Sequence, residues 1–179
     1  QERGRFSLPG SAWGCQGLPN GNRLVAINSH AMVIEYDDSG REVWRKDRLP
    51  APPTSVQRLD SGSTLIACGN TQQVVEVAPD GTTTVIEVPG HPISAQRLES
   101  GNTLVALQDA QRVVEVNSRG RILSEINTGS LPIHAVRLEN GNTLITLPQA
   151  RKVIEYDAPG KSIVWTTALP LLNPYAAER

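Results

Sequence analysis

The chain has 179 residues, with 17 lysines and arginines against 18 aspartates and glutamates. Because this balance leaves a net charge of −1, the sequence lacks the basic excess typical of nucleic-acid-binding proteins. No run approaches the roughly 18 apolar residues of a membrane-spanning helix, and a composition of 39% hydrophobic and 20% charged residues is typical of a soluble globular domain.

Four segments of the chain repeat one another almost without gaps. The first reads LPNGNRLVAINSHAMVIEYDDSGREVW, and the segments begin at Leu18, Leu59, Leu98 and Leu138. The glycines of the repeated Asn-Gly or Ser-Gly pair are 41, 39 and 40 residues apart; they are Gly21, Gly62, Gly101 and Gly141. A period of about 40 residues is that of a four-stranded propeller blade.

The second segment shows how each unit divides into strands. We expect strand A over Thr54–Leu59, strand B over Ser63–Cys68, strand C over Gln73–Val77 and strand D over Thr82–Val88. These runs are short, rich in β-branched residues and bounded by turn residues, and none has the apolar spacing of a helix. Apolar residues on both faces of strands B and C predict strands that lie between neighbouring blades.

The sequence therefore predicts an all-β propeller of four complete blades, approximately 11–50, 51–90, 91–130 and 131–170. Residues 1–10 contain a segment expected to be a D strand, and residues 171–179 one expected to be an A strand, both belonging to flanking blades. We interpret the chain as a single, partial propeller domain from a ring of six to eight blades. Closure by a second chain and a self-contained four-bladed disc are the alternatives.

The repeats share the pattern G-N-T-L-(I/V)-A, followed by (V/I)-(I/V)-E-(V/Y), a glycine and a tryptophan. This pattern resembles the blades of the bacterial NHL, PQQ-like and arylsulfotransferase-like repeat families. The resemblance lies in the scaffold and implies a β-propeller. The PQQ-like ending T-G-x-x-x-W is matched in its spacing by Gly40 and Trp44, whereas the middle two repeats have no tryptophan. We expect no bound cofactor, and no motif assigns the sulfuryl-transfer role of the arylsulfotransferase-like enzymes to a particular histidine.

Charged residues recur at two places in the repeat. The glutamates of strand C are Glu35, Glu76, Glu115 and Glu155, and the arginines of strand A are Arg58, Arg97 and Arg137. A glutamate between apolar residues of a strand is expected to be largely buried, and a buried charge needs a partner. We predict structural ion pairs between these arginines and glutamates, within a blade or across to the next.

No group of residues predicts a metal site or catalysis. The histidines His30, His91 and His134 map to one face but belong to different blades and lack metal-ligand spacing. The two cysteines, Cys15 and Cys68, align with apolar residues, so we expect both to be buried. Nucleophile-elbow, zinc-protease, P-loop and dinucleotide-binding motifs are absent from the sequence.

The loops diverge while the strands repeat. Asn70, Asp109 and Gln149 share one place in the B–C loop, where the first unit has Ser29 followed by His30. Because binding residues concentrate on loops held by a rigid frame, we expect the face with the B–C and D–A loops to bind a ligand. The predicted binding residues are His30, Arg48, Asn70, His91, Asp109, Gln149 and His134.

Three functions fit this sequence. The first is a non-enzymatic module that presents these loops to a protein, peptide or glycan, with no nucleic acid or membrane as partner. The second is a propeller enzyme of the arylsulfotransferase-like or quinoprotein-like kind with its site at the central channel. The third is a structural segment that closes a ring with a second copy or with further blades. An extracytoplasmic location, such as the periplasm, is favoured over a cytoplasmic one.

Overall fold

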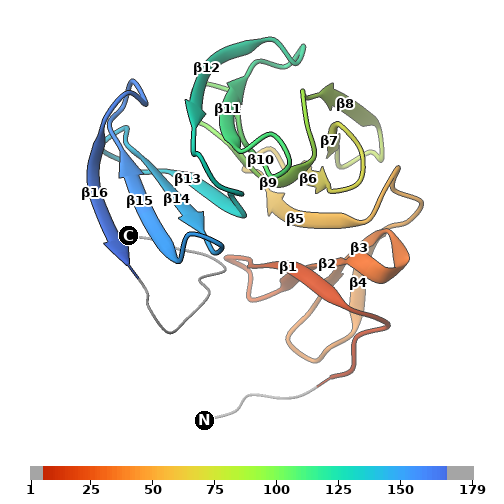
Figure 1. Ribbon diagram of the computed structural model, residues 1–179. Coiled ribbons are helices and arrows are strands. Elements are labelled where there is room, and N and C mark those ends of the chain that lie inside the picture. The colour runs from red at the N-terminus through yellow and green to blue at the C-terminus, as the bar shows by residue number, and fades with distance from the viewer. Residues whose placement is uncertain (1–5, 169–179) are drawn as a thin grey trace.

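The computed structural model describes residues 6–168, and these residues form four sheets (Figure 1). Each sheet has four antiparallel strands that follow one another in sequence order. The first two sheets comprise β1 (Ala12–Gly17), β2 (Arg23–Ile27), β3 (Met32–Tyr36), β4 (Glu42–Lys46), β5 (Pro53–Arg58), β6 (Thr64–Cys68), β7 (Gln73–Val77) and β8 (Thr83–Glu87). The last two comprise β9 (Pro92–Arg97), β10 (Thr103–Leu107), β11 (Arg112–Val116), β12 (Ile122–Asn127), β13 (His134–Arg137), β14 (Thr143–Leu147), β15 (Lys152–Tyr156) and β16 (Ile163–Ala168).

The four sheets follow one another around a common centre, with β1, β5, β9 and β13 innermost and β4, β8, β12 and β16 outermost (Figure 1). This radial order is that of propeller blades. The prediction of an all-β propeller with four-stranded antiparallel blades is confirmed. The strands of the four sheets fall inside the ranges 11–50, 51–90, 91–130 and 131–170.

The core consists of layers between adjacent blades. In the second blade, Ile66 and Val75 pack against the first blade, whereas Leu65 and Val74 pack against the third. Successive residues of a strand point to opposite faces, so a strand with a blade on each side is buried on both faces. All five residues of β6 are buried for this reason.

The turns at one end of the blades are uniform. All eight A–B and C–D turns contain a glycine with positive φ: Gly21, Gly40, Gly62, Gly81, Gly101, Gly120, Gly141 and Gly160. At Gly120, φ is +76° and a Cβ would lie 2.3 Å from the carbonyl oxygen of Glu87. This position needs glycine both for its backbone conformation and for the close approach of the neighbouring blade.

Helical structure within residues 6–168 is confined to the 3₁₀ turn η1 (Asn28–His30). No helix of this part of the chain has the length and apolarity needed to cross a bilayer.

Only part of the two predicted flanking segments is described. Of residues 1–10, predicted to include a strand of a flanking blade, residues 6–10 are described and form no strand. Phe6 instead packs its ring against Tyr36 of β3, with 4.9 Å between ring centroids. The strand expected in residues 171–179 lies outside the described residues.

The expectation that both cysteines are buried is wrong for one of them. Cys68 is fully buried, and burial raises the pKa of its thiol to about 11. Cys15 is exposed, because β1 carries it on the side of the first blade that faces away from the second.

Candidate functional site

The two ends of the blades have different connections. At one end, which we call the loop face, three of the four B–C loops are hydrogen-bonded to a D–A loop in the part of the chain that the structure describes. The loop face comprises the B–C loops 28–31, 69–72, 108–111 and 148–151 and the D–A loops 47–52, 88–91 and 128–133. The amide of Gly69 donates to Pro52 O over 3.0 Å, that of Gln108 to His91 O over 3.0 Å, and that of Thr128 to Gln111 O over 2.9 Å. These bonds hold the loops against the sheets.

The loop face contains most of the predicted binding residues. His30, Asn70, Asp109, Gln149, Arg48 and His91 are exposed there. His30 lies in η1, where its Nδ1 is 2.9 Å from Ser29 Oγ. His134 differs from the others because it opens the inner strand β13, opposite Thr146, and is half-buried.

Two of these residues are brought together by the structure. The backbone amide of His91 donates to Asp109 Oδ1 over 2.8 Å, and His91 Nδ1 lies 3.7 Å from Asp109 Oδ2. The loop between β8 and β9 positions His91, and the loop between β10 and β11 positions Asp109. Of the other predicted residues, His134 belongs to β13 and the rest to separate loops, and none of them is bonded to this pair by a hydrogen bond or ion pair that the described residues show.

The loop face also contains the strained backbone of the molecule. Four non-glycine residues have positive φ, and all lie there: Ala31, Arg48, Gln111 and Arg151. Such a conformation is uncommon for residues with a side chain and is found in tight turns and at functional sites. The opposite end, which we call the turn face, uses glycine at this conformation in all eight of its turns.

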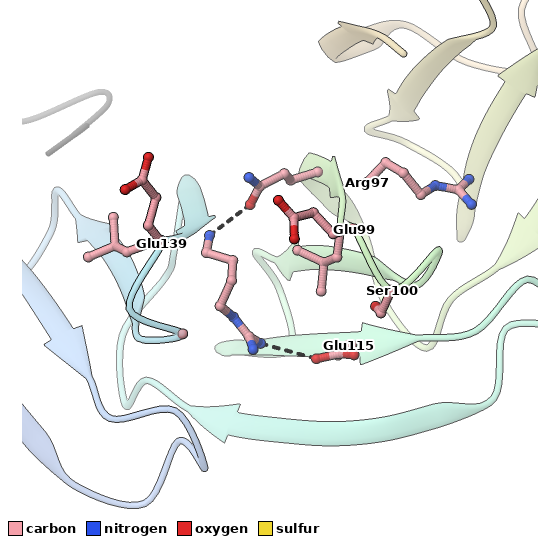
Figure 2. Close-up of a pocket in the computed structure, with 10 residues that line it drawn as sticks. Arg97, Glu99, Ser100, Glu115 and Glu139 are labelled. Carbon is pink, nitrogen blue, oxygen red and sulfur yellow. Dashed lines mark hydrogen bonds and ion pairs between the residues drawn. The ribbon is translucent and has the colours of Figure 1, made fainter. Parts of the chain in front are cut away.

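A cavity lies on the turn face, at the end of the blades opposite the loop face (Figure 2). It has a volume of about 560 Å³ and lies between the third and fourth blades, beside Arg97, Glu99, Ser100, Glu115 and Glu139. A second cavity of about 360 Å³ lies at the corresponding place between the first two blades. The cavities recur because the gap between adjacent A–B turns recurs.

An ion pair joins each two adjacent blades, and the pairs Arg58–Glu35 and Arg137–Glu115 each line one of the cavities. Arg58 Nη2 lies 2.6 Å from Glu35 Oε2, and Arg97 Nη2 lies 2.6 Å from Glu76 Oε2. Arg137 Nη2 lies 3.1 Å from Glu115 Oε2 (Figure 2). In each case the arginine belongs to one blade and the glutamate to the blade before it. Glu35 and Glu115 also accept hydrogen bonds from asparagine amides, over 2.6 Å from Asn22 Nδ2 and 2.8 Å from Asn102 Nδ2 respectively.

Sequence reasoning overlooked a second set of residues at these interfaces. Gln16, Gln57 and Gln96 accept the backbone N–H of the arginine of the next blade, over 2.6, 2.8 and 2.7 Å respectively. Ser55 and Ser94 accept the N–H of Ala95 and Ala135 in the same way. The signal was the recurrence of Gln before Arg-Leu in two repeats and before Gly-Leu in another.

Groups suited to metal binding or nucleophilic catalysis are not assembled in residues 6–168. No cluster of three or more histidine, cysteine or acidic side chains there could hold a metal ion. The buried Cys68 thiol, with its raised pKa, is protonated at neutral pH. The arrangement on the loop face instead offers exposed amide, imidazole, guanidinium and carboxylate groups for hydrogen bonding.

Comparison with known proteins identifies the scaffold. No family model and no curated protein matches the sequence. A protein of unknown function from Bacteroides caccae has a similar structure, with a TM-score of 0.68 and 25% identity over 89% of this chain and 68% of that one. A streptogramin B lyase has a TM-score of 0.75 and 18% identity over 92% and 57%. Virginiamycin B lyase from Staphylococcus aureus has a TM-score of 0.71 and 14% identity over 89% and 56%.

The chain therefore shares a β-propeller scaffold with bacterial proteins, which confirms the resemblance at the level of the scaffold. It spans little more than half the length of the two lyases that it matches. The identities to these lyases are low enough that the likeness establishes the fold alone.

Proposed function

We propose that this propeller is a non-catalytic binding module whose loop face holds a polar partner, either a protein, a peptide or a glycan. The observation that supports this most is the contrast between the two ends of the blades. The turn face repeats one glycine turn, whereas the loop face varies in sequence at matching places and contains the four non-glycine residues of positive φ. Variation on a constant frame is how scaffolds acquire binding specificity.

The loops are suited to binding because they are held in place before a partner arrives. Their backbones are bonded to one another, as Thr128 is to Gln111. A preformed surface loses little conformational entropy on binding. The exposed side chains donate and accept hydrogen bonds and are mostly polar, which suits hydroxyl groups of a glycan or the backbone of a peptide better than an apolar ligand.

The experiment is a binding screen with two matched variants. The full chain is applied to a glycan array and to a displayed peptide library. A loop-face variant combines Arg48→Ala, Asn70→Ala and Gln149→Ala, and a turn-face variant combines Asn20→Ala, Glu99→Ala and Glu139→Ala. We expect the loop-face variant to lose the binding that the turn-face variant keeps. Binding that is lost only in the turn-face variant would move the site to the cavities between the A–B turns.

A lyase is the second function to test, because His91 lies against Asp109. A carboxylate beside an imidazole can orient it as a general base. Among the structural neighbours, a streptogramin B lyase is an enzyme by its name, and a histidine-to-alanine form of virginiamycin B lyase is described as catalytically inactive. Incubation with quinupristin, followed by mass spectrometry, tests this function. Turnover that His91→Asn abolishes would favour the lyase, and the absence of any product would favour the binding module.

A further inference from the structure

The three interfaces between blades share one directional set of contacts. Within this set the later blade donates and the earlier blade accepts, although Asn28, Lys46 and Thr54 also donate from an earlier blade to a later one outside the set. The arginine side chain donates to the glutamate of the earlier blade, and the arginine backbone N–H donates to its glutamine. In two of the three interfaces a second backbone N–H donates to a serine. Every blade therefore has a donor side and an acceptor side, and the two are not interchangeable.

The donor side of the first blade has no other described blade against it, and its inner strand β1 is exposed. Trp13 is 63% exposed, and Cys15 and Gly17 are exposed as well. The residues at the place of Cys15 in the next three blades are Val56, Ala95 and Ala135, all of which are at least partly buried. The exposed stretch Trp13–Gly17 thus has the position of an interface.

The outer part of the same side is covered by residues 6–10 of the chain. Phe6-Ser7-Leu8-Pro9-Gly10 aligns with Ile86-Glu87-Val88-Pro89-Gly90, which ends the outermost strand of the second blade. A Cβ on Gly40 would lie 2.8 Å from Phe6, just as a Cβ on Gly160 would lie 2.6 Å from Ile126 of the outermost strand β12. Phe6 therefore lies where the outermost strand of a preceding blade would lie.

The same residues are less buried than their counterparts. Phe6 is 38% exposed against 2% for Ile86, and Leu8 is 38% exposed against 3% for Val88. A D strand is buried by strands A to C of its own blade as well as by the next blade. The contacts that Phe6 and Leu8 lack are those with strands of their own blade.

We propose that the donor side of the first blade docks the three inner strands of a further propeller blade, for which Phe6–Leu8 forms the outermost strand. This interaction is independent of the loop face and of the function proposed for it. The interface continues the one that joins the four described blades. The partner is a β-sheet edge of defined composition and not a general apolar ligand.

The missing arginine defines the chemistry of this partner. Gly17 stands where Arg58, Arg97 and Arg137 stand in the later blades. A carboxylate at the glutamate position of the docked blade would have no guanidinium opposite it, and a half-buried charge without a partner is costly. The docked blade therefore carries a neutral residue there. It also carries a glutamine on its inner strand, to accept the backbone N–H of Gly17.

A second copy of this chain fits that description poorly. The acceptor side of its fourth blade would place Val136, whose side chain cannot accept a hydrogen bond, at the glutamine position. The bond from a backbone N–H to a glutamine, which every described interface shares, would then be missing. The occupant is a different blade.

The test adds such a blade to the full chain. Residues 1–5 are replaced by a copy of residues 51–85, so that Val85 of the copy runs into Phe6. The copy carries Cys68→Ala, which leaves Cys15 as the reporter thiol because the chain's own Cys68 is buried. Four versions are made. The copy has either the natural glutamate or Glu76→Gln, and the rest of the chain has either the natural Gly17 or Gly17→Arg. Thiol labelling and thermal unfolding are measured on each.

We expect Cys15 to be labelled at least about 10-fold more slowly in the extended chain than in the natural one, because a residue at a closed interface reacts only when the interface opens. With Gly17, the version with Glu76→Gln should unfold at the higher temperature. With Gly17→Arg, the version with glutamate in the copy should unfold at the higher temperature. Rapid labelling of Cys15 in a folded extended chain would overturn the proposal. So would an extended chain in which the same residue of the copy, glutamate or glutamine, gives the higher unfolding temperature both with Gly17 and with Gly17→Arg.

Light scattering of the natural chain provides a test that does not depend on the added blade. We expect a monomer whose Cys15 is labelled rapidly at every concentration measured. A dimer that protects Cys15 would show that a second copy occupies the donor side, and the proposal would be wrong.

Discussion

The arginine that ends the inner strand of each later blade contacts several elements at once. Arg97 donates through Nη2 to Glu76 of the earlier blade, through Nη1 to Gly101 O of its own A–B turn, and through its backbone N–H to Gln57. One side chain thus joins a strand of the neighbouring blade to the turn that follows its own strand. Arg58 adds a contact with the ring of Trp44, with 4.8 Å from its guanidinium carbon to the ring centroid.

Removal of this side chain should destabilise the fold. We expect Arg97→Ala to lower the free energy of unfolding by about 2 kcal/mol, since it removes two charge-assisted bonds and leaves Glu76 partly buried without its cation. The matched control is Arg45→Ala, which breaks an exposed pair with Glu42 and should lower the free energy of unfolding far less, because water screens the pair. Urea unfolding compares the two variants. Equal losses would show that the inter-blade pair contributes no more than a surface pair.

Asp37, which begins the C–D turn of the first blade, is a second residue whose effect on stability can be predicted. Asp37 accepts hydrogen bonds from the Ser39 hydroxyl and from the backbone N–H of Arg41. These bonds hold its pKa below the ordinary value of 3.8, the Ser39 hydroxyl having the largest effect. A lowered carboxyl pKa in the folded state stabilises the fold above the unfolded value, and this stabilisation is lost as the pH falls through the folded value.

Asp37→Asn should therefore be less stable than the natural chain at neutral pH, and the difference should shrink below about pH 4. Asp38→Asn is the matched control, because the Asp38 side chain accepts none of these bonds. Thermal unfolding from pH 7 to pH 2 measures both variants. A difference between Asp37→Asn and the natural chain that stays constant down to pH 2 would contradict the assignment.

At the scale of elements, C–D turns that look alike in sequence differ in their surroundings. Gly81 and Gly120 both have positive φ, yet a Cβ on Gly81 would have no atom within 4 Å, whereas one on Gly120 would meet the backbone of β8. We expect Gly81→Ala to cost about 1 kcal/mol for the backbone conformation and Gly120→Ala about 2 kcal/mol more for the clash. Chemical denaturation distinguishes them, and equal costs would mean that the adjacent blades do not approach this closely.

Most elements were predictable because each depends on local patterns. The predicted strand C of the second unit coincides with β7 (Gln73–Val77), and the other three differ from β5, β6 and β8 by one residue or two. The two-sided apolar pattern of strands B and C and the turn glycines were sufficient for this. The segment 6–10 was not predictable as a non-strand, because a strand forms only where a neighbouring strand completes its ladder of hydrogen bonds.

The candidate site was less predictable, because it depends on how blades are placed relative to one another. The repeat reveals that Arg97 and Glu76 recur but not which blade supplies the partner of each. The cavities on the turn face arise from gaps between blades, which no local pattern encodes. The exposure of Cys15 has the same origin, since its counterparts are covered by a blade that precedes them.

At the scale of the whole molecule, the contacts define a direction around the centre. Each described interface pairs an arginine of the later blade with a glutamate of the earlier one, so the blades can be joined in only one order. This order explains why the two outer sides of the four-bladed unit differ. It is also the reason why we propose that the donor side of the first blade, where Gly17 lies, binds a blade unlike the chain's own fourth blade.

The pairing order is tested most directly by two double-mutant cycles on Arg97→Glu, with stability measured by urea unfolding. One cycle adds Glu76→Arg in the earlier blade, and the other adds Glu115→Arg in the same blade as Arg97. We expect a favourable coupling energy of about 1–2 kcal/mol between positions 97 and 76 and almost none between positions 97 and 115. A coupling that favours Glu115 over Glu76 would place the pair within one blade and contradict the directional order.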